Sequence, residues 1–257
     1  MSRTRATAVS APDVVRLGTV LSTQAVAFDL AARGAADRTV VLADHQTAGR
    51  GRRGRAWQDA PGASLLVSIL VRPALDVRSL PWLSYVAAIA VAEALQEAAG
   101  LAPRLKWPND VLVDDHKIAG ILLETRATTA APRPPTPRAG LAAPVTVIGI
   151  GINLEPASVP PELADRATSV REAGGRPVER ETLLAAVVAA LDGWRARLER
   201  EGVEPIRRGW LALAHTIGRR VEVGEVRGVA VDLDAGGALV VDADGGRRRV
   251  VAGELEG

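Results

Sequence analysis

Residues 45–57 read His-Gln-Thr-Ala-Gly-Arg-Gly-Arg-Arg-Gly-Arg-Ala-Trp. Four arginines and three glycines lie within seven residues, from Gly49 to Arg55, directly after an apolar β-type run. Glycine lets the backbone approach a ligand closely, and arginine presents a planar fork of donors that fits carboxylate and phosphate oxygens. The stretch therefore predicts a flexible cationic loop that closes on an anion, and it indicates a phosphate compound as the ligand.

The same letters also satisfy G-x-G-x-x-G, with glycines at 49, 51 and 54. A dinucleotide-binding fingerprint must open a helix and needs an acidic residue about twenty positions later. Here the loop runs into a turn containing Pro61 and Gly62 and then into a β-like run from Ser64. This context argues against a dinucleotide fold and leaves two simpler alternatives for the loop alone, a solvated basic loop or a nucleic-acid patch.

The composition of the 257 residues predicts an ordinary soluble protein, with 47% hydrophobic and 24% charged residues. No apolar run is long enough to span a bilayer, and the N-terminus lacks the apolar core of a signal peptide. We therefore expect a cytoplasmic location and no membrane partner. The absence of cysteine and the scatter of the three histidines argue against disulfides and structural zinc. A net charge of only +2 does not indicate a nucleic-acid partner.

The pattern of apolar residues predicts both helices and strands, which agrees with an α/β (α+β) protein without naming its fold. Helices are expected at 21–32, 81–99, 181–200 and 204–214, and strands at 39–43, 64–72, 105–107, 111–113, 117–125 and 145–154. The Pro-rich segment 126–144 is expected to be a mobile insertion. Gly149 and Gly151 indicate positions that another group approaches closely. Four short β runs at 220–223, 226–232, 238–242 and 247–251 predict a small barrel or sandwich, so we divide the chain at 14–214 and 215–257.

Four further motifs accompany the arginine loop. They are Ser22-Thr-Gln24, Lys106-Trp-Pro-Asn-Asp110, Lys117-Ile-Ala-Gly-Ile-Leu-Leu-Glu124 and Gly149-Ile-Gly-Ile-Asn153. In this order and spacing the five motifs resemble those of the biotin protein ligases, and the resemblance runs from Val20 to the C-terminal β region. It implies a mixed β-sheet flanked by helices, similar to the catalytic domain of class II aminoacyl-tRNA synthetases, followed by an SH3-like barrel.

The resemblance implies a two-step, ATP-dependent ligase. Biotin and Mg-ATP form biotinyl-5'-adenylate and pyrophosphate, and a lysine of a biotin carboxyl carrier protein of an acyl-CoA carboxylase then takes the biotinyl group. The first step brings a carboxylate against a triphosphate, so positive charge must offset the repulsion before the α-phosphate can be attacked. Biotin, ATP with Mg²⁺ and the carrier domain are the expected partners.

The resemblance also assigns roles to residues. The catalytic set is Arg50, Arg52 and Lys117. The expected biotin contacts are Ser22, Thr23, Gln24, Gln46, Arg50, Gly51, Arg52, Lys117 and Gly120. The expected ATP contacts are Arg52, Arg53, Arg55, Trp57, Lys106, Asn109, Asp110 and Asn153. Asp110 is a candidate ligand of Mg²⁺ or a group that orients the incoming lysine. Gln24 departs from the family's more frequent Asn, but a longer amide still donates and accepts.

Simpler structural roles remain open for several of these residues. Ser22 and Thr23 could be helix caps and nothing more. Trp107 is more typical of packed core, and Pro108-Asn109 is typical of a tight turn. Lys117 taken alone would be a solvated strand lysine. We expect the glycine-rich loop to be mobile without ligand and to order over the adenylate, with Arg52 retaining that intermediate.

Two other functions compete with the ligase. A lipoate or octanoate protein ligase shares the fold but not the arginine loop and the Lys106–Asp110 motif. A nucleic-acid-binding module would use the arginine loop together with Arg247, Arg248 and Arg249. The short segment before residue 14 is too small for a helix-turn-helix domain, so we expect no operator binding.

Overall fold

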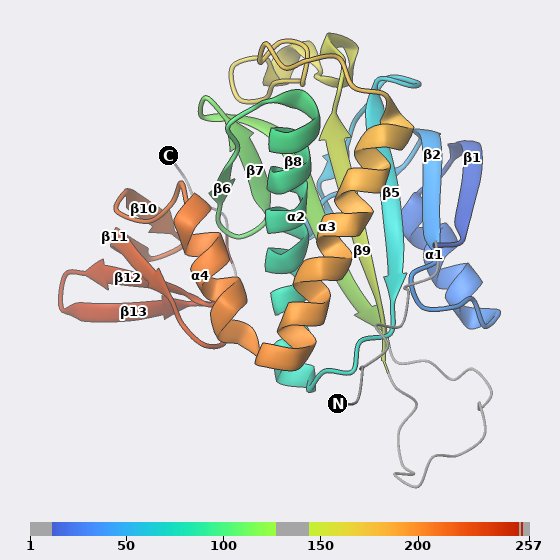
Figure 1. Cartoon of the computed structure of the whole chain (residues 1–257). Helices are drawn as coiled ribbons and strands as arrows, with labels where there is room; N and C mark the ends of the chain where they lie inside the picture. The colour runs from blue at the N-terminus through green and yellow to red at the C-terminus, as the bar shows by residue number, and fades with distance from the viewer. Residues whose placement is uncertain (1–11, 127–143, 252, 254–257) are drawn as a thin grey trace, which may run out of the picture.

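The computed structural model describes residues 12–126, 144–251 and 253. These residues form a seven-stranded sheet, a four-stranded sheet and a two-stranded hairpin, arranged as in Figure 1. The predicted Pro-rich insertion at 126–144 lies outside the described residues except for its two ends, and so does part of the last stretch of the chain, residues 252 and 254–257. No helix in the described ranges has the length and apolar character needed to cross a bilayer.

The large sheet is mixed, as predicted. Its strand order is β1-β2-β5-β9-β8-β7-β6, and β1 is parallel to β2 whereas the other neighbours pair antiparallel. Its strands are β1 (Val14–Val20), β2 (Val40–Gln46), β5 (Ser64–Val71), β6 (Arg104–Lys106), β7 (Asp110–Val113), β8 (His116–Arg126) and β9 (Val145–Asn153). The sequence patterns identified the six others but not the edge strand β1.

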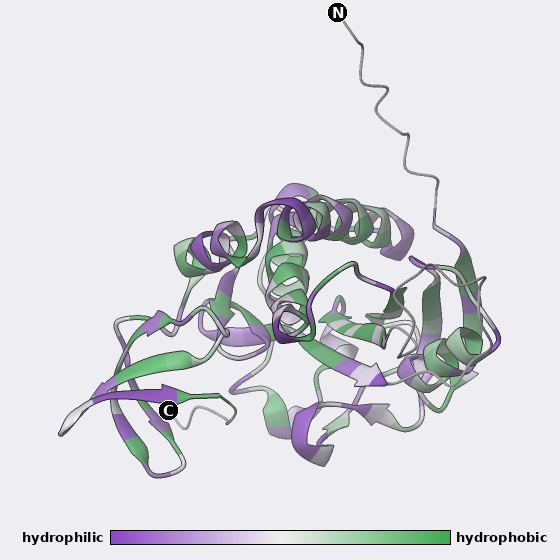
Figure 2. Cartoon of the chain, turned by 90° about the horizontal axis from the view of Figure 1, so that it is seen from below, coloured by the Kyte–Doolittle hydropathy of each residue, from purple (hydrophilic) through white to green (hydrophobic). Residues whose placement is uncertain are grey.

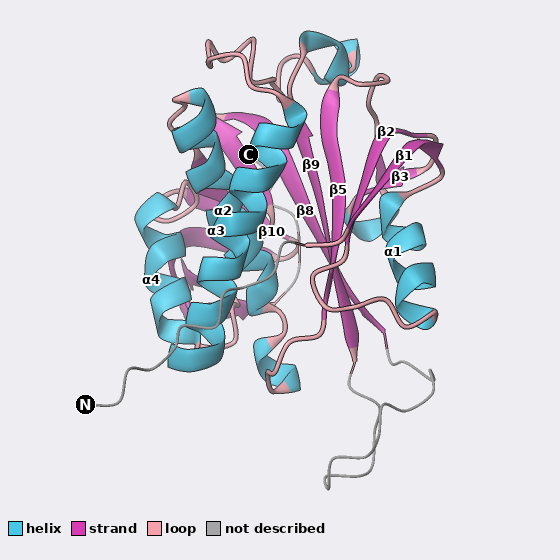
Figure 3. Cartoon of the chain, turned by 45° about the vertical axis from the view of Figure 1, so that its right-hand side comes forward, coloured by secondary structure: helices cyan, strands magenta, loops and turns pink. Residues whose placement is uncertain are grey.

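Four α-helices flank this sheet, three on one side and α1 on the other (Figure 3). They are α1 (Thr23–Ala32), α2 (Trp82–Ala99), α3 (Arg180–Glu201) and α4 (Val203–Leu213), and short 3₁₀ turns lie at η1 (Arg52–Gly54), η2 (Val77–Ser79), η3 (Pro156–Ser158) and η4 (Pro161–Leu163). Helix α2 begins after Pro81 and ends at Gly100, whose φ of 71° is the left-handed conformation that glycine adopts without strain. Both ends agree with the sequence prediction.

Alternation along β9 separates two cores. Ile148, Ile150 and Ile152 pack with α2 and α3, whereas Val145 and Val147 pack with α1. Successive strand residues point to opposite faces, so each face of the sheet buries its own set of side chains. The face toward α2 and α3 is largely apolar, and the other face packs apolar side chains against α1, which leaves its remaining part for the site.

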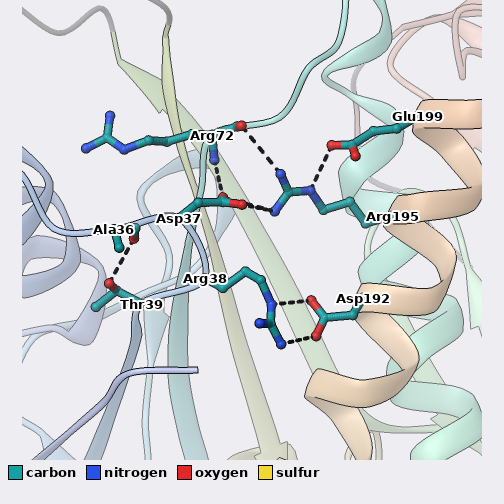
Figure 4. A network of polar contacts seen from close by, with 8 residues as sticks. All are labelled: Ala36, Asp37, Arg38, Thr39, Arg72, Asp192, Arg195 and Glu199. Carbon is teal, nitrogen blue, oxygen red and sulfur yellow. Dashed lines mark hydrogen bonds and ion pairs between the residues drawn. The ribbon is translucent and has the colours of Figure 1, made fainter. Parts of the chain in front are cut away.

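Ion pairs join α3 to the loop before β2, and a hydrogen bond from Arg195 to the Arg72 carbonyl joins α3 to the end of β5 (Figure 4). Arg195 donates to both carboxylate oxygens of Asp37 at 2.9 Å and to Glu199 at 2.9 Å. Arg38 pairs with Asp192 through two nitrogens, one of them at 2.8 Å. These pairs are partly buried, and the two-nitrogen geometry of Arg38 with Asp192 makes that pair more directional than a single surface pair.

The C-terminal sheet is an antiparallel meander of β10 (Arg220–Val223), β11 (Val226–Leu233), β12 (Leu239–Ala243) and β13 (Gly246–Val250). It lies to one side of the large sheet (Figure 2). All four strands fall where the sequence predicted short β runs, and an irregularity between Ala230 and Asp232 shifts the register of β11.

Candidate active site

A polar cluster lies at the start of α1. Thr23 donates its backbone N–H to Gln46 Oε1 at 2.8 Å, and its hydroxyl lies 2.8 Å from Ser68 Oγ. Ser68 donates to Gln24 Oε1 at 3.2 Å, and Gln24 Nε2 faces the carbonyls of Leu122 and Val147 at 3.3 and 3.4 Å. The cluster thus brings together side chains from α1, β2 and β5, and it presents both donors and acceptors.

Ser22 occupies the position that precedes the first turn of α1, but its side chain makes no capping hydrogen bond. The residue is buried, with 5% of its surface exposed. Capping would require the side-chain oxygen to accept from a backbone N–H of the first turn. Capping therefore does not explain the buried Ser22.

Three glycines form a floor next to this cluster. Gly120 of β8 is paired with Gly151 of β9, and Gly149 lies on the same face two residues before Gly151. A Cβ at Gly149 would lie 2.4 Å from Gln24 Oε1, and one at Gly151 would lie 2.6 Å from the ring of Trp57. The glycines are needed because other side chains lie directly on the sheet, which confirms the predicted close approach.

The arginine loop is a small hairpin in which β3 (Gly49–Arg50) pairs with β4 (Ala56–Trp57). Gly51 N–H donates to the Arg55 carbonyl at 2.7 Å, which closes the turn. The hairpin carries Trp57 over the glycine floor, and the Lys117 ammonium lies 5.7 Å from the centroid of the Trp57 ring. The mobility of this segment without ligand stays a prediction.

A pair of titratable side chains, His45 and Asp59, comes from the two segments that flank the hairpin in the chain. His45 Nδ1 lies 3.0 Å from Asp59 Oδ2, and the Asp59 side chain is completely buried. Burial raises the pKa of Asp59, while the hydrogen bond from His45 acts in the opposite direction. Asp59 is a functional candidate that only the structure reveals, because one carboxylate in a turn carries no spacing signal in the sequence.

The cations of the site are paired with polar groups from other strands. Arg50 Nη2 lies 2.9 Å from Glu124 Oε2, and Lys117 Nζ lies 2.6 Å from Asp110 Oδ1. Arg52 Nη1 donates to Asn109 Oδ1 at 3.4 Å. The arginine hairpin is thereby joined to β8 and to the Lys106–Asp110 motif, so three of the sequence motifs meet at one place.

The Lys106–Asp110 motif is a turn between β6 and β7, as predicted for Pro108-Asn109. The Trp107–Pro108 peptide bond is cis. Trp107 is buried core, with 1% of its surface exposed, so the structural interpretation is correct for this residue. Asn109 Nδ2 donates to the Ile121 carbonyl at 2.8 Å, which fixes the turn against β8.

The remaining predicted ATP contacts lie around this centre. Arg53 and Arg55 are exposed on the hairpin, and Lys106 is partly buried on β6. Asn153, at the end of β9, is buried, and its Nδ2 donates to the Thr168 carbonyl at 3.0 Å.

A cleft of about 630 Å³ separates the arginine hairpin from β8. Residues 48–56 line one side, and Leu122, Leu123 and Glu124 line the other. Small-molecule sites commonly have volumes of about 300–1,000 Å³. The cleft has the size for a small ligand, an arginine-rich wall and the polar cluster nearby.

The described residues contain no group of three or more His, Cys, Asp or Glu side chains that could hold a metal ion. Mg²⁺ is often bound by one or two carboxylates and the phosphates of a nucleotide instead of by a protein cage. Asp110 and Glu124 border the site, and each is paired with a cation. The residues therefore fit a metal that arrives with a nucleotide.

Two sequence families match the chain. Residues 17–131 match the Biotin/lipoate A/B protein ligase family, and residues 216–256 match the Biotin protein ligase C terminal domain. A Paracoccus denitrificans protein named biotin–acetyl-CoA-carboxylase ligase is 36% identical over 249 residues, which cover 91% of this chain and 96% of that protein. The chain belongs to the biotin protein ligase family.

Further relatives agree with this membership. The bifunctional ligase/repressor BirA of Bacillus subtilis is 33% identical over 241 residues, which cover 91% of this chain and 71% of the relative. The structure of biotin protein ligase from Aquifex aeolicus in complex with biotin and ATP superposes with a TM-score of 0.79 at 28% identity, covering 95% of this chain and 97% of the other. The predicted family and the predicted mixed α/β fold are both confirmed.

Proposed function

We propose that the chain activates biotin with ATP and transfers the biotinyl group to a lysine of a carboxyl carrier domain. The observation that carries the proposal is the meeting of motifs on one face of the large sheet. The polar cluster lies at one side of the glycine floor, and Lys117 and the arginine hairpin lie at the other. This arrangement suits a ligand with an uncharged polar ring at one end and a carboxylate at the other, which is the chemistry of biotin.

The polar cluster would hold the ureido ring. Thr23, Gln24 and Gln46 supply hydroxyl and amide groups that both donate and accept, and Ser22 adds a hydroxyl that does not cap the helix. A Cβ at Gly120 would lie 3.0 Å from the Trp57 ring and 3.2 Å from the Lys117 ammonium, so glycine lets both groups lie on the floor. A lipoyl ring offers no ureido group to such a cluster, so its recognition would leave these buried polar groups unpaired at a cost.

The cations would act at the other end of biotin. A carboxylate oxygen of biotin attacks the α-phosphorus of ATP, the bond to the bridging oxygen breaks, and pyrophosphate leaves. Arg50, Arg52 and Lys117 would offset the negative charge that gathers there, because preorganised charges stabilise a transition state without having to reorient. Exchanging Glu124 and Asp110 for substrate oxygens as partners would free Arg50 and Lys117 for this task.

Mg²⁺ bound to the triphosphate would supply additional charge stabilisation, with Asp110 as the protein carboxylate available to it. Gly51, Arg53, Arg55, Trp57, Lys106, Asn109 and Asn153 complete the proposed ligand contacts. In the second step the lysine amine of the carrier attacks the acyl carbon, AMP leaves, and the amine loses its proton. We place this chemistry in the cytoplasm, where ATP and carboxylases meet.

We also propose the division into a catalytic unit, 14–214, and a C-terminal unit, 215–257. The two family matches, which end at 131 and begin at 216, support a boundary in this region. Helix α4 ends at Leu213, and β10 begins at Arg220.

Mass spectrometry tests the proposed function. The purified chain is incubated with Mg-ATP and either biotin or lipoate, with and without a carboxyl carrier domain. We expect biotinyl-5'-adenylate in the tube without carrier and a biotinyl mass gain on the carrier in the other. A lipoyl adduct would assign the chain to the lipoate branch of the family, and no adduct with either acid would refute ligase activity.

A further inference from the structure

Trp107, in the middle of the Lys106–Asp110 motif, is held by the C-terminal part of the chain. Its backbone N–H donates to Thr216 Oγ1 at 2.9 Å, and its indole N–H donates to the Tyr85 hydroxyl at 3.1 Å. The Tyr85 hydroxyl donates in turn to the Gly237 carbonyl at 2.5 Å. Both N–H groups of Trp107 therefore lead to residues beyond α4, one directly and one through Tyr85.

The direction of this chain of hydrogen bonds is fixed by chemistry. An indole N–H can only donate, so Tyr85 must accept from Trp107 and use its single proton for Gly237. Burial raises the pKa of Tyr85 to about 12, so the hydroxyl keeps that proton at neutral pH. With 5% of the Tyr85 surface exposed, water has little access to replace either partner.

Strand β6, which leads into the Lys106–Asp110 motif, is also hydrogen-bonded to the segment that directly follows α4. Leu105 and Ala214 form a parallel bridge, and the His215 N–H donates to the Leu105 carbonyl at 2.8 Å. Arg104 Nη2 donates to the Ala214 carbonyl at 2.7 Å. From residue 104 to residue 107 the chain is thus bonded along its length to the segment that starts the C-terminal region.

The Lys106–Asp110 motif connects this anchored segment to two cations of the site. Two residues after Trp107, Asn109 accepts from Arg52 Nη1, and one residue later Asp110 lies 2.6 Å from Lys117 Nζ. Arg52 and Lys117 are the cations that the proposed reaction requires at the carboxylate and phosphate. A displacement of the turn would therefore move the partners of both cations, while the polar cluster on α1, β2 and β5 would keep its own contacts.

We propose that Tyr85 is a positioning residue for the ligase reaction, through which the turn at Gly237 sets the position of the Lys106–Asp110 motif. The inference rests on the proposed function. It gives the C-terminal sheet a role in adenylate formation through a defined pair of hydrogen bonds, and it predicts a catalytic defect from changes that touch no substrate.

The test compares Tyr85→Phe with a matched control, Trp82→Phe. Trp82 is also buried, packs against the Tyr85 ring with 4.8 Å between centroids and donates to the Ala235 carbonyl of the same turn at 3.0 Å, but its indole N–H makes none of the hydrogen bonds that join Trp107 to Gly237. Steady-state adenylate formation is measured for both variants, with thermal unfolding as the measure of stability. We expect Tyr85→Phe to lower kcat about tenfold or more, since small misplacements of catalytic groups have effects up to about a hundredfold.

The KM for biotin should stay unchanged in Tyr85→Phe, because the polar cluster lies away from the turn. Trp82→Phe should lower Tm at least as much as Tyr85→Phe but should keep the wild-type kcat. Equal kcat values for Tyr85→Phe and wild type would overturn the proposal. A fall in kcat in both variants that follows their loss of Tm would also overturn it, because that result is what a purely structural role produces.

Gly237→Ala tests the same link from the other side. Its φ of 79° disfavours other residues, and a Cβ there would lie 2.9 Å from the Tyr85 ring. We expect this variant to reproduce the kcat defect and the double variant with Tyr85→Phe to be no worse than either alone, since coupled sites are not additive. Additive defects would refute the link. If the wild-type protein forms no adenylate, the proposed function fails instead, and the two failures are thereby distinguished.

Discussion

The two faces of strand β9 differ although the same nine residues make both. Toward α2 and α3 the strand presents Ile148, Ile150 and Ile152, which are buried against helix side chains. Toward the site it presents Gly149 and Gly151, where the side chains of Gln24 and Trp57 fill the space that a Cβ would need. One face stabilises the fold by burying apolar surface, and the other leaves a floor on which ligand-binding groups lie.

The difference shows how one strand can serve stability and function separately. Apolar side chains on the helix face contribute stability roughly in proportion to the area they bury. The site face gives up that contribution at two positions and gains a flat surface beside the polar cluster. Substitutions on the two faces should therefore have separable effects, on unfolding for one and on ligand handling for the other.

The largest effect is expected from Lys117→Gln on the site face. Losing a charge that stabilises a transition state should lower the rate of adenylate formation about 100- to 1,000-fold. The side chain is about one-third exposed (34%), so Tm should change little. Quench-flow measurement of adenylate, with Lys117→Arg as the charge-conserving control, checks the prediction. A variant that keeps more than about a tenth of the wild-type rate would remove Lys117 from the catalytic set.

A smaller effect on the same face is expected from Gly151→Ala. The new methyl group would lie 2.6 Å from the Trp57 ring and must displace it. Overpacking typically costs about 1–3 kcal/mol, and the same free energy lost from binding is about a 5- to 150-fold fall in biotin affinity. Titration calorimetry measures this affinity.

Gly193→Ala is the matched control for this prediction, because nothing lies within 4 Å of the added Cβ on α3. It should leave biotin affinity unchanged and raise stability slightly, since alanine favours helices. Similar affinities for the two variants would contradict the idea that the glycine floor is part of the ligand site.

The opposite outcome is expected on the helix face for Ile150→Val. Removing one buried methylene should lower the free energy of unfolding by about 0.5–1.5 kcal/mol. Biotin affinity should not change, because the side chain points away from the floor. Urea unfolding and calorimetry on the same sample test both statements, and a clear loss of affinity would show that the two faces are not independent.

The smallest effect concerns His215, which lies on neither face. Burial lowers the pKa of His215, although its hydrogen bond to Asp115 acts against this and Arg219 and Lys106 act with it. An unfolded histidine has a pKa of about 6.5, so between that value and the lower folded pKa the unfolded state binds more protons. Stability should therefore fall as the pH drops through this window.

His215→Gln should lose this part of the pH dependence. The decrease in Tm from about pH 7.5 to about pH 5.5 should be smaller in the variant than in wild type, because glutamine does not titrate there. The hydrogen bond lowers the pKa of Asp115, so this carboxylate stays charged throughout the range. An identical decrease in both proteins would show that His215 does not contribute.

Local patterns predicted most of the elements. The helix from Pro81 to Gly100 was readable because its ends carry residues with defined backbone preferences, and β9 was readable from its apolar run. The edge strand β1 was missed, because its mixed residues give no clear alternation. The predicted loop at 49–55 is a hairpin in the structure. The hydrogen bonds that close it join main-chain atoms, so the residue types do not predict them.

The site was predicted as a set of motifs but not as a geometry. Ser68 joins Thr23 and Gln24, yet its only signal in the sequence is a polar residue inside an apolar strand. Glu124 belonged to a predicted motif, but its pairing with Arg50 was not foreseen. Both contacts join residues more than forty positions apart, and side-chain pairing at that separation depends on how strands are ordered in the sheet.

The sequence by itself determined the alternation of β9, the close approach at its glycines and the membership of the motifs in one family. These features depend on short-range geometry, since the strand period of two and the lack of a Cβ act wherever the chain goes. Only the tertiary structure decided that Gln24 and Trp57 are the groups lying on the glycines and that Tyr85 joins Trp107 to Gly237. Those contacts depend on packing between distant segments, which no local pattern of residues encodes.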